Sequence, residues 1–380
     1  TFNEDAIVKL MKSYPNDPLY PLILDHREYQ KLYSTYIGVT QPDGKIHGGM
    51  EIGRDGRIHC VYTHNPSTLR LACQAPNMQN LPRPRGDDAL QTIVRNLVVA
   101  GPGQVLVAVD FAGIEAVLTG YFACDPQYIR LAKQDVHTYY TVYALHELDG
   151  RVSAADLPDI SWPDEELFPY LAYLKTRFKH ERNTLYKHLV HAANFMQTPS
   201  GAQAKMFSET RVEYPLKMVA KVMDVYFSLF PSIRRWHTSV LAEAEKDGYL
   251  RNPFGYVHRF SKVMNWKKEF GKWSSKPNPD VANKVVAMKP QSTASAIIKE
   301  AALRLYFERF NEAGQYLRLQ VHDELLGEAP TEQAAAVIAV MQEEMERPIP
   351  ELGLPASYGM GSHLVVNTES KQGYRWGSVR

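Results

Sequence analysis

The sequence lacks the features that mark several classes of protein. It has only three cysteines, Cys60, Cys73 and Cys124, and their spacing fits neither a metal site nor a disulfide framework, which suits a reducing compartment. It has no apolar run long enough to span a bilayer, no signal-peptide pattern at its N-terminus and no internal repeat or low-complexity tract. We therefore expect a soluble, intracellular protein that has no membrane partner.

A strong net charge is also absent, because 43 lysines and arginines balance 42 aspartates and glutamates. Binding to nucleic acid therefore has to be argued from local patches and not from net charge. The length of 380 residues exceeds that of one typical core, which predicts two or three subdomains. Residues 1–37 have apolar side chains at helical spacing and begin abruptly, so we expect one or two helices and a missing upstream segment.

Two acidic positions lie at the ends of predicted strands. The apolar run 105–109 is typical of a strand buried on both faces, and it stops at Asp110, after which the spacing becomes helical. Residues 317–330 have the pattern of two strands joined by a tight turn, which contains Asp323 and Glu324. Taken singly, Asp110 fits a helix cap and Asp323 fits a solvated turn equally well.

The two aspartates would converge if both strands belonged to one sheet. Converging carboxylates repel each other unless a divalent cation neutralises them, and oxygen-only ligation suits Mg²⁺. Two such ions can activate a hydroxyl and stabilise a leaving oxygen in an in-line phosphoryl transfer. Glycosidases also use paired carboxylates, so the pair alone does not decide the chemistry.

Other polar stretches admit both a functional and an ordinary structural interpretation. Residues 67–86 are rich in amide and basic side chains, which suit sugar and phosphate contacts but are also common in surface loops. Lys187, His191 and Phe195 are four residues apart, which predicts one helix face with a cation, an imidazole and a ring. This face fits a triphosphate clamp with a stacking platform, or a solvated basic surface.

Two further segments are distinctive in composition. A basic stretch begins at Arg251 and ends near Lys272, with Trp266 and Trp273 interleaved. Pro290 is expected to open a helix, because a proline at the first helical position costs no hydrogen bond. Small residues follow Gln291, so either a nucleic acid or a neighbouring backbone could approach that edge closely.

Three segments together resemble the motifs of the family A DNA polymerases, the bacterial, phage and organellar polymerase I group. They are RLACQAPNMQNLP from Arg70, VAVDFAGIEAVL around Asp110 and LQVHDELLGEAP around Asp323, and their order and approximate spacing also match. DVHT at 135–138 and KPQSTASAIIK at 289–299 resemble further family segments. The resemblance covers nearly the whole chain.

The resemblance implies an α+β, multidomain, right-hand polymerase fold with an antiparallel-sheet palm, helical fingers and a truncated thumb. The implied domains are a thumb remnant at 1–40, a palm at 41–128 and 286–380, and fingers at 129–285. It also implies a location in the cytoplasm of a bacterial or phage-infected cell, or in an organelle. An upstream exonuclease or thumb segment is expected to be absent from this chain.

The resemblance also assigns residue roles. Asp110 and Asp323 are implied metal ligands, with the backbone of Phe111 as a third ligand, and Glu324 is an implied accessory acid near the primer end. Glu115 matches a glutamate whose position blocks a ribose 2′-hydroxyl. The other implied or alternative nucleotide contacts are His137, Arg182, Lys187, His191 and Phe195. The implied primer and template contacts are Arg70, Asn77, Gln79, Asn80, Gln291 and His322.

The predicted fingers helix departs from the family pattern. His191 stands where the family has a phosphate-binding lysine, and the charge of a histidine near neutral pH depends on its surroundings. Lys187 or Arg182 is the alternative source of that positive charge. Met196 and Pro199 stand where the family has a glycine and a tyrosine, which bears on how a template base would be positioned.

These observations lead us to expect template-directed DNA synthesis from dNTPs on primer–template DNA, with two Mg²⁺ ions for which Mn²⁺ can substitute. One alternative is a single-subunit RNA polymerase, against which Glu115 argues. Another is a primer–template binding module that is inactive because the fingers helix has diverged and the thumb is truncated.

Overall fold

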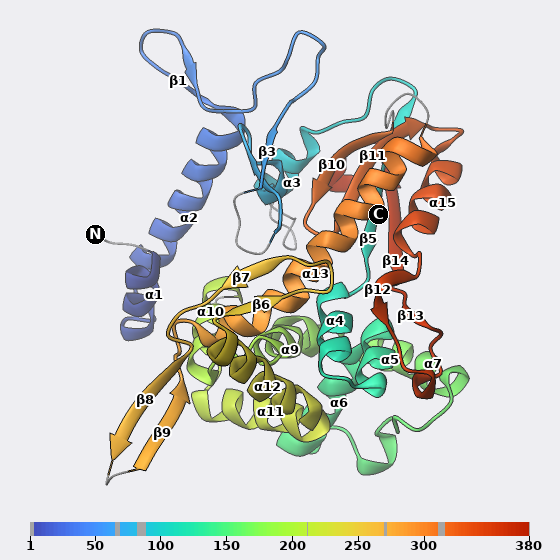
Figure 1. Cartoon of the computed structure of the whole chain (residues 1–380). Coiled ribbons are helices and arrows are strands. Elements are labelled where there is room, and N and C mark those ends of the chain that lie inside the picture. The colour runs from blue at the N-terminus through green and yellow to red at the C-terminus, as the bar shows by residue number, and fades with distance from the viewer. Residues whose placement is uncertain are drawn as a thin grey trace.

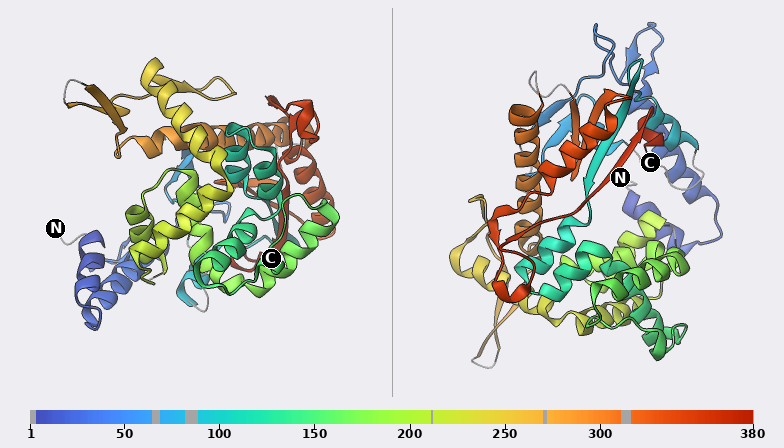
Figure 2. Two further views of the ribbon diagram at one scale, coloured as in Figure 1. Left: turned by 90° about the horizontal axis from the view of Figure 1, so that it is seen from below. Right: turned by 90° about the vertical axis from the view of Figure 1, so that its right-hand side faces the viewer.

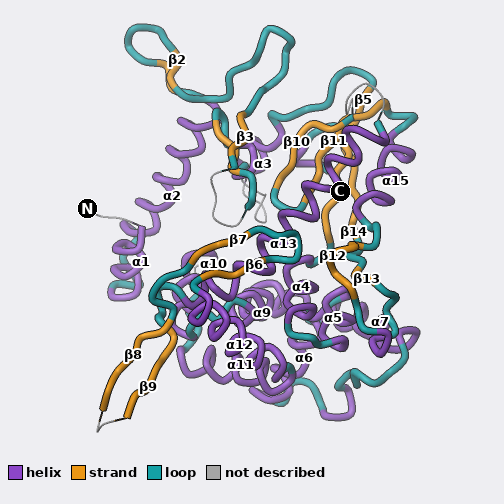
Figure 3. The backbone as a smooth tube through the Cα atoms, viewed as in Figure 1, coloured by secondary structure: helices purple, strands orange, loops and turns teal. Residues whose placement is uncertain are grey.

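A four-stranded antiparallel sheet and a large helical region make up most of the molecule, as the separation of strands and helices in Figure 3 shows. The computed structural model describes residues 4–64, 69–81, 89–210, 212–269, 272–310 and 316–379. Arg83 and Arg85, which belong to the polar stretch 67–86, lie outside the described residues.

The helices of the described residues are α1 (Glu4–Ser13), α2 (Leu19–Leu32), α3 (Ala89–Asn96), α4 (Ile114–Phe122), α5 (Pro126–Gln134), α6 (Val136–Asp149), α7 (Asp164–Arg177), α8 (Lys179–Glu181), α9 (Lys187–Asn194), α10 (Pro199–Thr210), α11 (Leu216–Leu229), α12 (Pro231–Asp247), α13 (Ala282–Arg304) and α15 (Ala334–Met345). Short 3₁₀ or π-helical turns are η1 (Tyr33–Ile37), η2 (Met78–Asn80), η3 (Ala154–Asp156), η4 (Arg182–Tyr186), η5 (Leu305–Arg309), η6 (Ala356–Tyr358) and η7 (Trp376–Ser378). The strands are β1 (Val39–Thr40), β2 (Ile46–His47), β3 (Val61–Thr63), β4 (Ala72–Gln74), β5 (Gln104–Phe111), β6 (Tyr249–Arg251), β7 (Val257–Arg259), β8 (Met264–Glu269), β9 (Lys272–Pro277), β10 (Leu317–Val321), β11 (Glu324–Pro330), β12 (Ile349–Gly353), β13 (His363–Leu364) and β14 (Thr368–Gly373).

The main sheet has the strand order β10-β11-β5-β14, and every neighbouring pair is antiparallel. The predicted hairpin over residues 317–330 is therefore confirmed, and it shares a sheet with the strand that carries Asp110. That strand continues through Phe111, one residue beyond the predicted stop. Helix α4 begins at Ile114 after Gly113, whose φ of +62° is left-handed, so Asp110 is not the cap of this helix.

Both faces of β5 are covered, as its apolar run predicts. Val107 and Val109 belong to a core shared with α13 and α15, whereas Leu106 and Ala108 belong to a second core. The second core includes residues from α2, β4, η2, α3 and η7. Figure 1 shows α13 and α15 beside the sheet, with β5 between β11 and β14.

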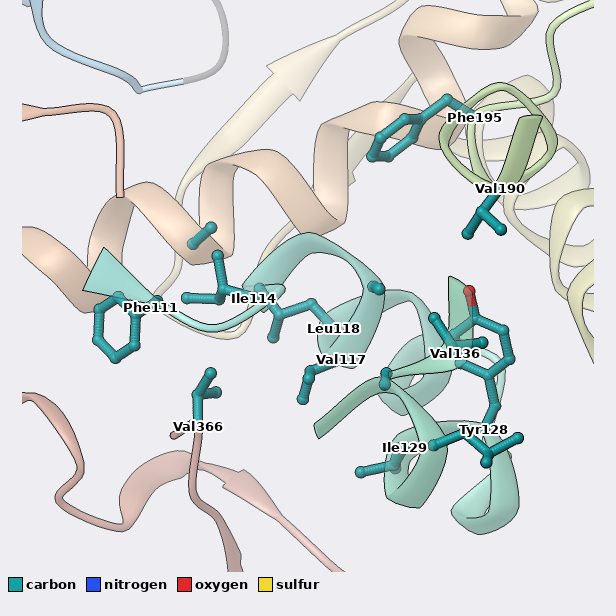
Figure 4. Close-up of a cluster of buried hydrophobic side chains, with 14 of the residues drawn as sticks. Phe111, Ile114, Val117, Leu118, Tyr128, Ile129, Val136, Val190, Phe195 and Val366 are labelled. Carbon is teal, nitrogen blue, oxygen red and sulfur yellow. The ribbon is translucent and has the colours of Figure 1, made fainter. Parts of the chain in front are cut away.

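The helical region is built on the helices that follow β5. Figure 4 shows part of this core, in which Ile114 and Val117 of α4 lie with side chains of α5, α6 and α9. A buried hydrogen-bond network joins α5, α9 and α11: the hydroxyl of Tyr128 donates to Oδ1 of Asn194 at 3.0 Å, and the hydroxyl of Tyr226 donates to that of Tyr128 at 2.8 Å. These bonds fix the position of α9 relative to α5 and α11.

Three sequence predictions are wrong in detail. The predicted helix face of Lys187, His191 and Phe195 is incomplete, because α9 ends at Asn194 and Phe195 lies just beyond it. Pro290 does not open a helix but lies inside α13, because extensive burial on both sides of the proline outweighs one lost hydrogen bond. Turn glycines that flank the alternating residues of 48–62 predict a hairpin, but the structure has one bridge there, between Ile52 and Ile58, and β3 pairs instead with β4.

Two segments extend from this body. Helices α1 and α2 form a small core in which Ile7, Val8 and Leu24 pack against Phe207 of α10. The antiparallel pair β8–β9 projects from the helical region, away from the main sheet, in Figures 1 and 2. Within the described ranges, no helix is both long and apolar enough to cross a membrane.

Candidate active site

Asp110 and Asp323 are neighbours at one end of the main sheet. A two-residue turn, His322 and Asp323, joins β10 to β11, and His322 has a left-handed φ of +60° that suits such a turn. The backbone amide of Phe111 donates a hydrogen bond to the carbonyl oxygen of Asp323 at 3.2 Å. The turn thus holds the second aspartate beside the end of the strand that carries the first.

Two glutamates flank Asp110 in the strand register. Glu324 of β11 is opposite Asp110 on one side, and Glu369 of β14 is opposite it on the other. Directly opposed residues of antiparallel strands share a face, so the three acidic side chains form a row across the sheet. Glu324 is buried, whereas Glu369 is exposed. Glu369 was not predicted, because it lies in a turn-rich tail and its place depends on strand pairing.

The donor set of this site suits a hard divalent cation. Burial raises the pKa of the Asp323 carboxyl above its ordinary value, and the nearby charge of Glu115 raises it further. The described residues contain no cluster of three His, Cys, Asp or Glu side chains that could hold a metal ion. Magnesium fits such a site, because it commonly takes one or two carboxylates and completes its shell with waters and substrate phosphates.

A cavity of about 650 Å³ lies beside Asp323. Its walls come from the start of α4 and from α6, α9 and α10. The predicted site residues that line it are Glu115, His137, Lys187, His191 and Asp323. The same cavity is therefore lined by Asp323 at the end of the sheet and by Lys187 and His191 of α9.

Glu115 connects the two sides of this cavity. The guanidinium of Arg70, in the loop before β4, forms an ion pair with its Oε1. Its Oε2 lies 3.5 Å from Nδ1 of His191 on α9. Only 20% of the Glu115 side chain is exposed, so the carboxylate is held in place between these partners.

His191 is neutral near pH 7. Its surroundings lower its pKa to about 4, mainly through burial and then through the positive charges of Lys205 and Arg70, against which Glu209 acts in the opposite direction. The ring is open to the cavity on one side, with 43% of the side chain exposed. His191 can therefore offer a hydrogen bond to a ligand but does not replace the charge of the family lysine.

His137 and Arg182 are less available to a ligand than His191 is, because Nδ1 of His137 is buried and Arg182 is engaged by Asp135. Burial lowers the pKa of His137 to about 3, and within the described chain its buried Nδ1 has no hydrogen-bond partner. Arg182 holds Asp135 through two nitrogens, with Nη2 at 2.8 Å from Oδ1 and Nε at 3.1 Å from Oδ2. Its Nε also lies 3.0 Å from Oγ1 of Thr138. This arrangement ties η4 to the start of α6, which leaves Lys187 as the predicted cation that lines the cavity.

Lys205 is a cavity residue that sequence reasoning missed. It lies on α10, is exposed and lines the same cavity as Lys187. No motif marks it, and its closeness to His191 follows from the packing of α10 beside α9. The neighbouring His188 and Glu209 form a pair, with 3.0 Å between Nδ1 and Oε2.

Phe195 and Gln291 line a second cavity, of about 230 Å³, together with His191 and His258. Phe195 is 4% exposed, and its ring lies edge-on to that of His191 at 4.8 Å. The ring is therefore largely covered by protein and is not an open platform. Gln197, which also lines this cavity, has a buried Oε1 that lacks a hydrogen-bond partner within the described chain.

The polar loop around η2 is tied to the β10–β11 hairpin. Nε2 of Gln79 donates to the backbone oxygen of Gln320 at 3.2 Å, and Gln320 donates in turn to the carbonyl of His322. Asn77 caps η2 by accepting from the amide of Asn80 at 3.2 Å. Gln79 is buried and Asn80 is exposed, so the first has a positioning role and the second can meet a ligand.

Relatives among known proteins cover most of this chain. It is 28% identical over 355 residues to the thermostable DNA polymerase I of Thermus thermophilus, a match that covers 90% of this chain and 36% of that protein. The corresponding enzyme of Thermus aquaticus is 29% identical over 357 residues, with the same two coverages of 90% and 36%. DNA polymerase I of Caldicellulosiruptor bescii is 24% identical over 379 residues, covering 99% of this chain and 37% of that protein. The chain thus spans little more than a third of these relatives.

A solved structure confirms the predicted fold. The POL domain of Pol1 from M. smegmatis, in complex with DNA primer-template and dNTP, matches with a TM-score of 0.69 and 21% sequence identity. The match covers 100% of this chain and 56% of that chain. The α+β polymerase fold with an antiparallel sheet and a helical region is therefore shared.

The sequence also matches a family model described as DNA polymerase family A, over residues 2–153 and 192–376. The unmatched segment 154–191 contains Arg182, Lys187 and His191, which agrees with the divergence of the fingers helix. Because the matched ranges include Asp110, Asp323 and most of the rest of the sequence, the chain belongs to DNA polymerase family A.

Proposed function

We propose that this chain catalyses template-directed DNA synthesis, in which the 3′-hydroxyl of a primer attacks the α-phosphate of a dNTP and pyrophosphate leaves. The observation that carries this proposal is that Asp323, which lies beside the strand end that carries Asp110, lines one cavity together with Lys187 and Lys205. Carboxylates at one end and cations at the other suit a nucleoside triphosphate and its metal ions.

In this proposal Asp110, Asp323 and the backbone of Phe111 hold two Mg²⁺ ions, for which Mn²⁺ can substitute. Such ions would supply Lewis-acid chemistry, by activating the primer hydroxyl and stabilising the charge on the departing phosphates. Glu324 serves as the accessory acid near the primer end, a role that its register opposite Asp110 supports.

The cavity walls orient the nucleotide. Lys187 and Lys205 attract the triphosphate, while neutral His191 donates or accepts a hydrogen bond. Glu115, held by Arg70, occupies space near the sugar and disfavours a 2′-hydroxyl, so that dNTPs are preferred. His137 and Arg182 support these residues from behind, and Phe195 closes the far end of the site.

Primer and template contacts come from the loop around η2, the turn of the palm hairpin and α13. The residues proposed for these contacts are Arg70, Asn77, Gln79, Asn80, Gln291 and His322. We assign residues 1–40 to a thumb remnant, 41–128 and 286–380 to the palm, and 129–285 to the fingers. The main sheet, formed by strands from both palm segments, supports this division.

Primer extension with Mg²⁺ tests the proposal. Wild-type chain should extend a DNA primer with dNTPs, and Asp110→Ala or Asp323→Ala should slow extension about a thousandfold or more, because several kcal/mol of transition-state stabilisation are lost. Asp247→Ala, at an exposed position in the last turn of α12, is the matched control and should extend normally. Undiminished extension by either active-site variant would refute the metal-site assignment.

The same assay separates the alternatives. Efficient incorporation of rNTPs would favour an RNA polymerase. Salt-sensitive binding of primer–template without extension would favour a binding module.

A further inference from the structure

The hairpin β8–β9 concentrates positive charge and aromatic surface in a chain that is otherwise nearly neutral. Residues 262–277 include five lysines and one glutamate, whereas the whole chain has a formal charge of +1. The two tryptophans of the hairpin are among the most exposed aromatic side chains of the described residues, with Trp266 57% and Trp273 65% exposed. Tryptophan is enriched at interfaces because its ring is apolar and its N–H is polar, which makes this surface a candidate binding site.

The strand register places the tryptophans on one face. Trp266 is opposite Ser275 and Lys268 is opposite Trp273, so these four side chains share a face of the hairpin. Nζ of Lys268 lies 5.7 Å from the centre of the Trp273 ring. The other face is basic and carries Lys267 and Lys276. The hairpin thus combines flat rings with flanking cations.

Trp266 is held by the body of the protein. Its Nε1 donates to Oε1 of Glu245 on α12 at 2.7 Å, and the amide of Met264 donates to Oε2 of the same carboxylate at 3.1 Å. Both bonds fix the base of the hairpin relative to α12. An oriented ring loses little entropy when it binds a partner, which favours its use as a stacking platform.

Part of the tryptophan face borders a cavity that shares a lining residue with the candidate active site. Trp266 and Ser275 line a cavity of about 850 Å³, which Met196 and Gln197 also line at the end of the fingers helix. Gln197 also lines both the 650 Å³ cavity beside Asp323 and the 230 Å³ cavity beside Phe195. Gln197 therefore lies between the hairpin and the candidate active site, which suits a strand that runs from one to the other.

We propose that the tryptophan face of β8–β9 binds the unpaired template strand on its way to the active site. Bases stack on Trp266 and Trp273, and Lys268 on the same face neutralises phosphate charge. The template role of this strand rests on the proposed function. The binding of single-stranded nucleic acid to the hairpin does not depend on that function. Stacking tolerates any base, so no sequence preference is expected.

Binding of a fluorescently labelled oligothymidylate, followed by anisotropy without dNTP or metal, tests the surface directly. Trp273→Ala should weaken binding about tenfold, because one stacking contact is lost. Lys268→Gln should reduce the slope of log affinity against log salt by about 0.7, as expected for one phosphate contact to a single strand. Phe307→Ala, which removes a ring that is 72% exposed on η5, is the matched control and should bind normally.

Three results would overturn the inference. They are wild-type affinity in Trp273→Ala, equal affinity for an abasic oligonucleotide of the same length, and equally effective competition by polyglutamate of matched charge. The last would identify an acidic peptide or a purely electrostatic surface. The thermal melting of Trp273→Ala, measured by circular dichroism, should equal that of the wild type. A loss of binding then cannot be attributed to unfolding of the variant.

Primer extension then separates the inference from the proposed function. Trp273→Ala should slow extension on templates with a long single-stranded overhang and leave extension over a one-nucleotide overhang unchanged. If wild-type chain extends neither template, the proposed function fails, and the oligothymidylate titration still decides the inference. Equal slowing on both templates would contradict it.

Discussion

The carboxylate of Glu115 lies between the guanidinium of Arg70 and the imidazole of His191. This arrangement joins three segments that are far apart in the sequence: the loop before β4, the first turn of α4 and helix α9. The two partners orient the carboxylate of Glu115 toward the cavity and restrict its side chain to one conformation.

Glu115→Ala should raise rNTP incorporation relative to dNTP incorporation. Removing the carboxylate leaves room for a 2′-hydroxyl and a gain of about tenfold in the kcat/KM ratio is expected, which corresponds to about 1.4 kcal/mol. Glu209→Ala removes another carboxylate of the same cavity and should leave the ratio unchanged. If the two variants discriminate sugars equally, Glu115 does not select the nucleotide.

The KM for dNTP should be flat between about pH 6 and pH 8. The pKa of His191 is lowered to about 4, so the ring is already neutral throughout this range and no proton is lost as the pH rises. The charged groups that face it are Lys205, Arg70, Glu209 and Glu115. Steady-state kinetics at several pH values measure this, with His191→Gln as a variant that cannot titrate. A KM that climbs through pH 6.5 in wild type, but not in His191→Gln, would show that the histidine binds phosphate as a cation.

Gly120→Ala should destabilise the protein by about 1–3 kcal/mol. A Cβ at this buried position of α4 would lie 2.8 Å from Cδ1 of Tyr128 and 3.0 Å from the amide nitrogen of Ile129, so α5 would have to move. Chemical denaturation measures the change. Gly353→Ala, at an exposed position whose nearest atom is 4.0 Å away, is the control and should have little effect.

Glu344→Ala should destabilise the protein by about 1–3 kcal/mol, because it removes a fully buried carboxylate that pairs with three partly exposed arginines. The Glu344 side chain is fully buried and binds Arg304 at 3.2 Å and Arg347 at 3.0 Å, and it also pairs with Arg309. The exposed neighbour Glu343 pairs with Arg309 at 2.7 Å, and Glu343→Ala should cost much less, because solvent screens an exposed ion pair. Equal losses in the two variants would mean that burial does not decide the strength of this network.

The sequence predicts the ends of the two strands at which Asp110 and Asp323 lie, but it does not predict which other side chains surround them. Asp110 and Asp323 are predictable because hydrophobic periodicity marks the strands that carry them, and because both lie in family motifs. Their adjacency needs strand pairing, which the structure supplies. The assigned roles of the site residues stay predictions.

The positions of residues that depend on tertiary packing or on strand pairing could not be predicted from the sequence. Lys205 reaches the cavity only because α10 follows α9 around one core, and Glu369 reaches Asp110 only through the pairing of β14. Arg182 was considered as a phosphate contact, but a bidentate pair with Asp135 engages it, a partner that spacing does not reveal. The sequence predicts that a helix begins at Pro290, whereas α13 begins at Ala282. The preference of proline for the first helical position is a local property and takes no account of the burial that stabilises the longer helix.

The pairing of β5 has a consequence for how the chain acquires its structure. Among the described residues, the strands that pair with β5 are β11 and β14, at residues 324–330 and 368–373, far later in the sequence than the end of β5 at residue 111. During synthesis its apolar surface must remain uncovered by these partners until nearly the whole chain has emerged. Contacts between such distant residues fold slowly, and an unpaired apolar strand is prone to aggregate. Truncation before residue 368 should therefore yield insoluble protein and not a smaller folded unit.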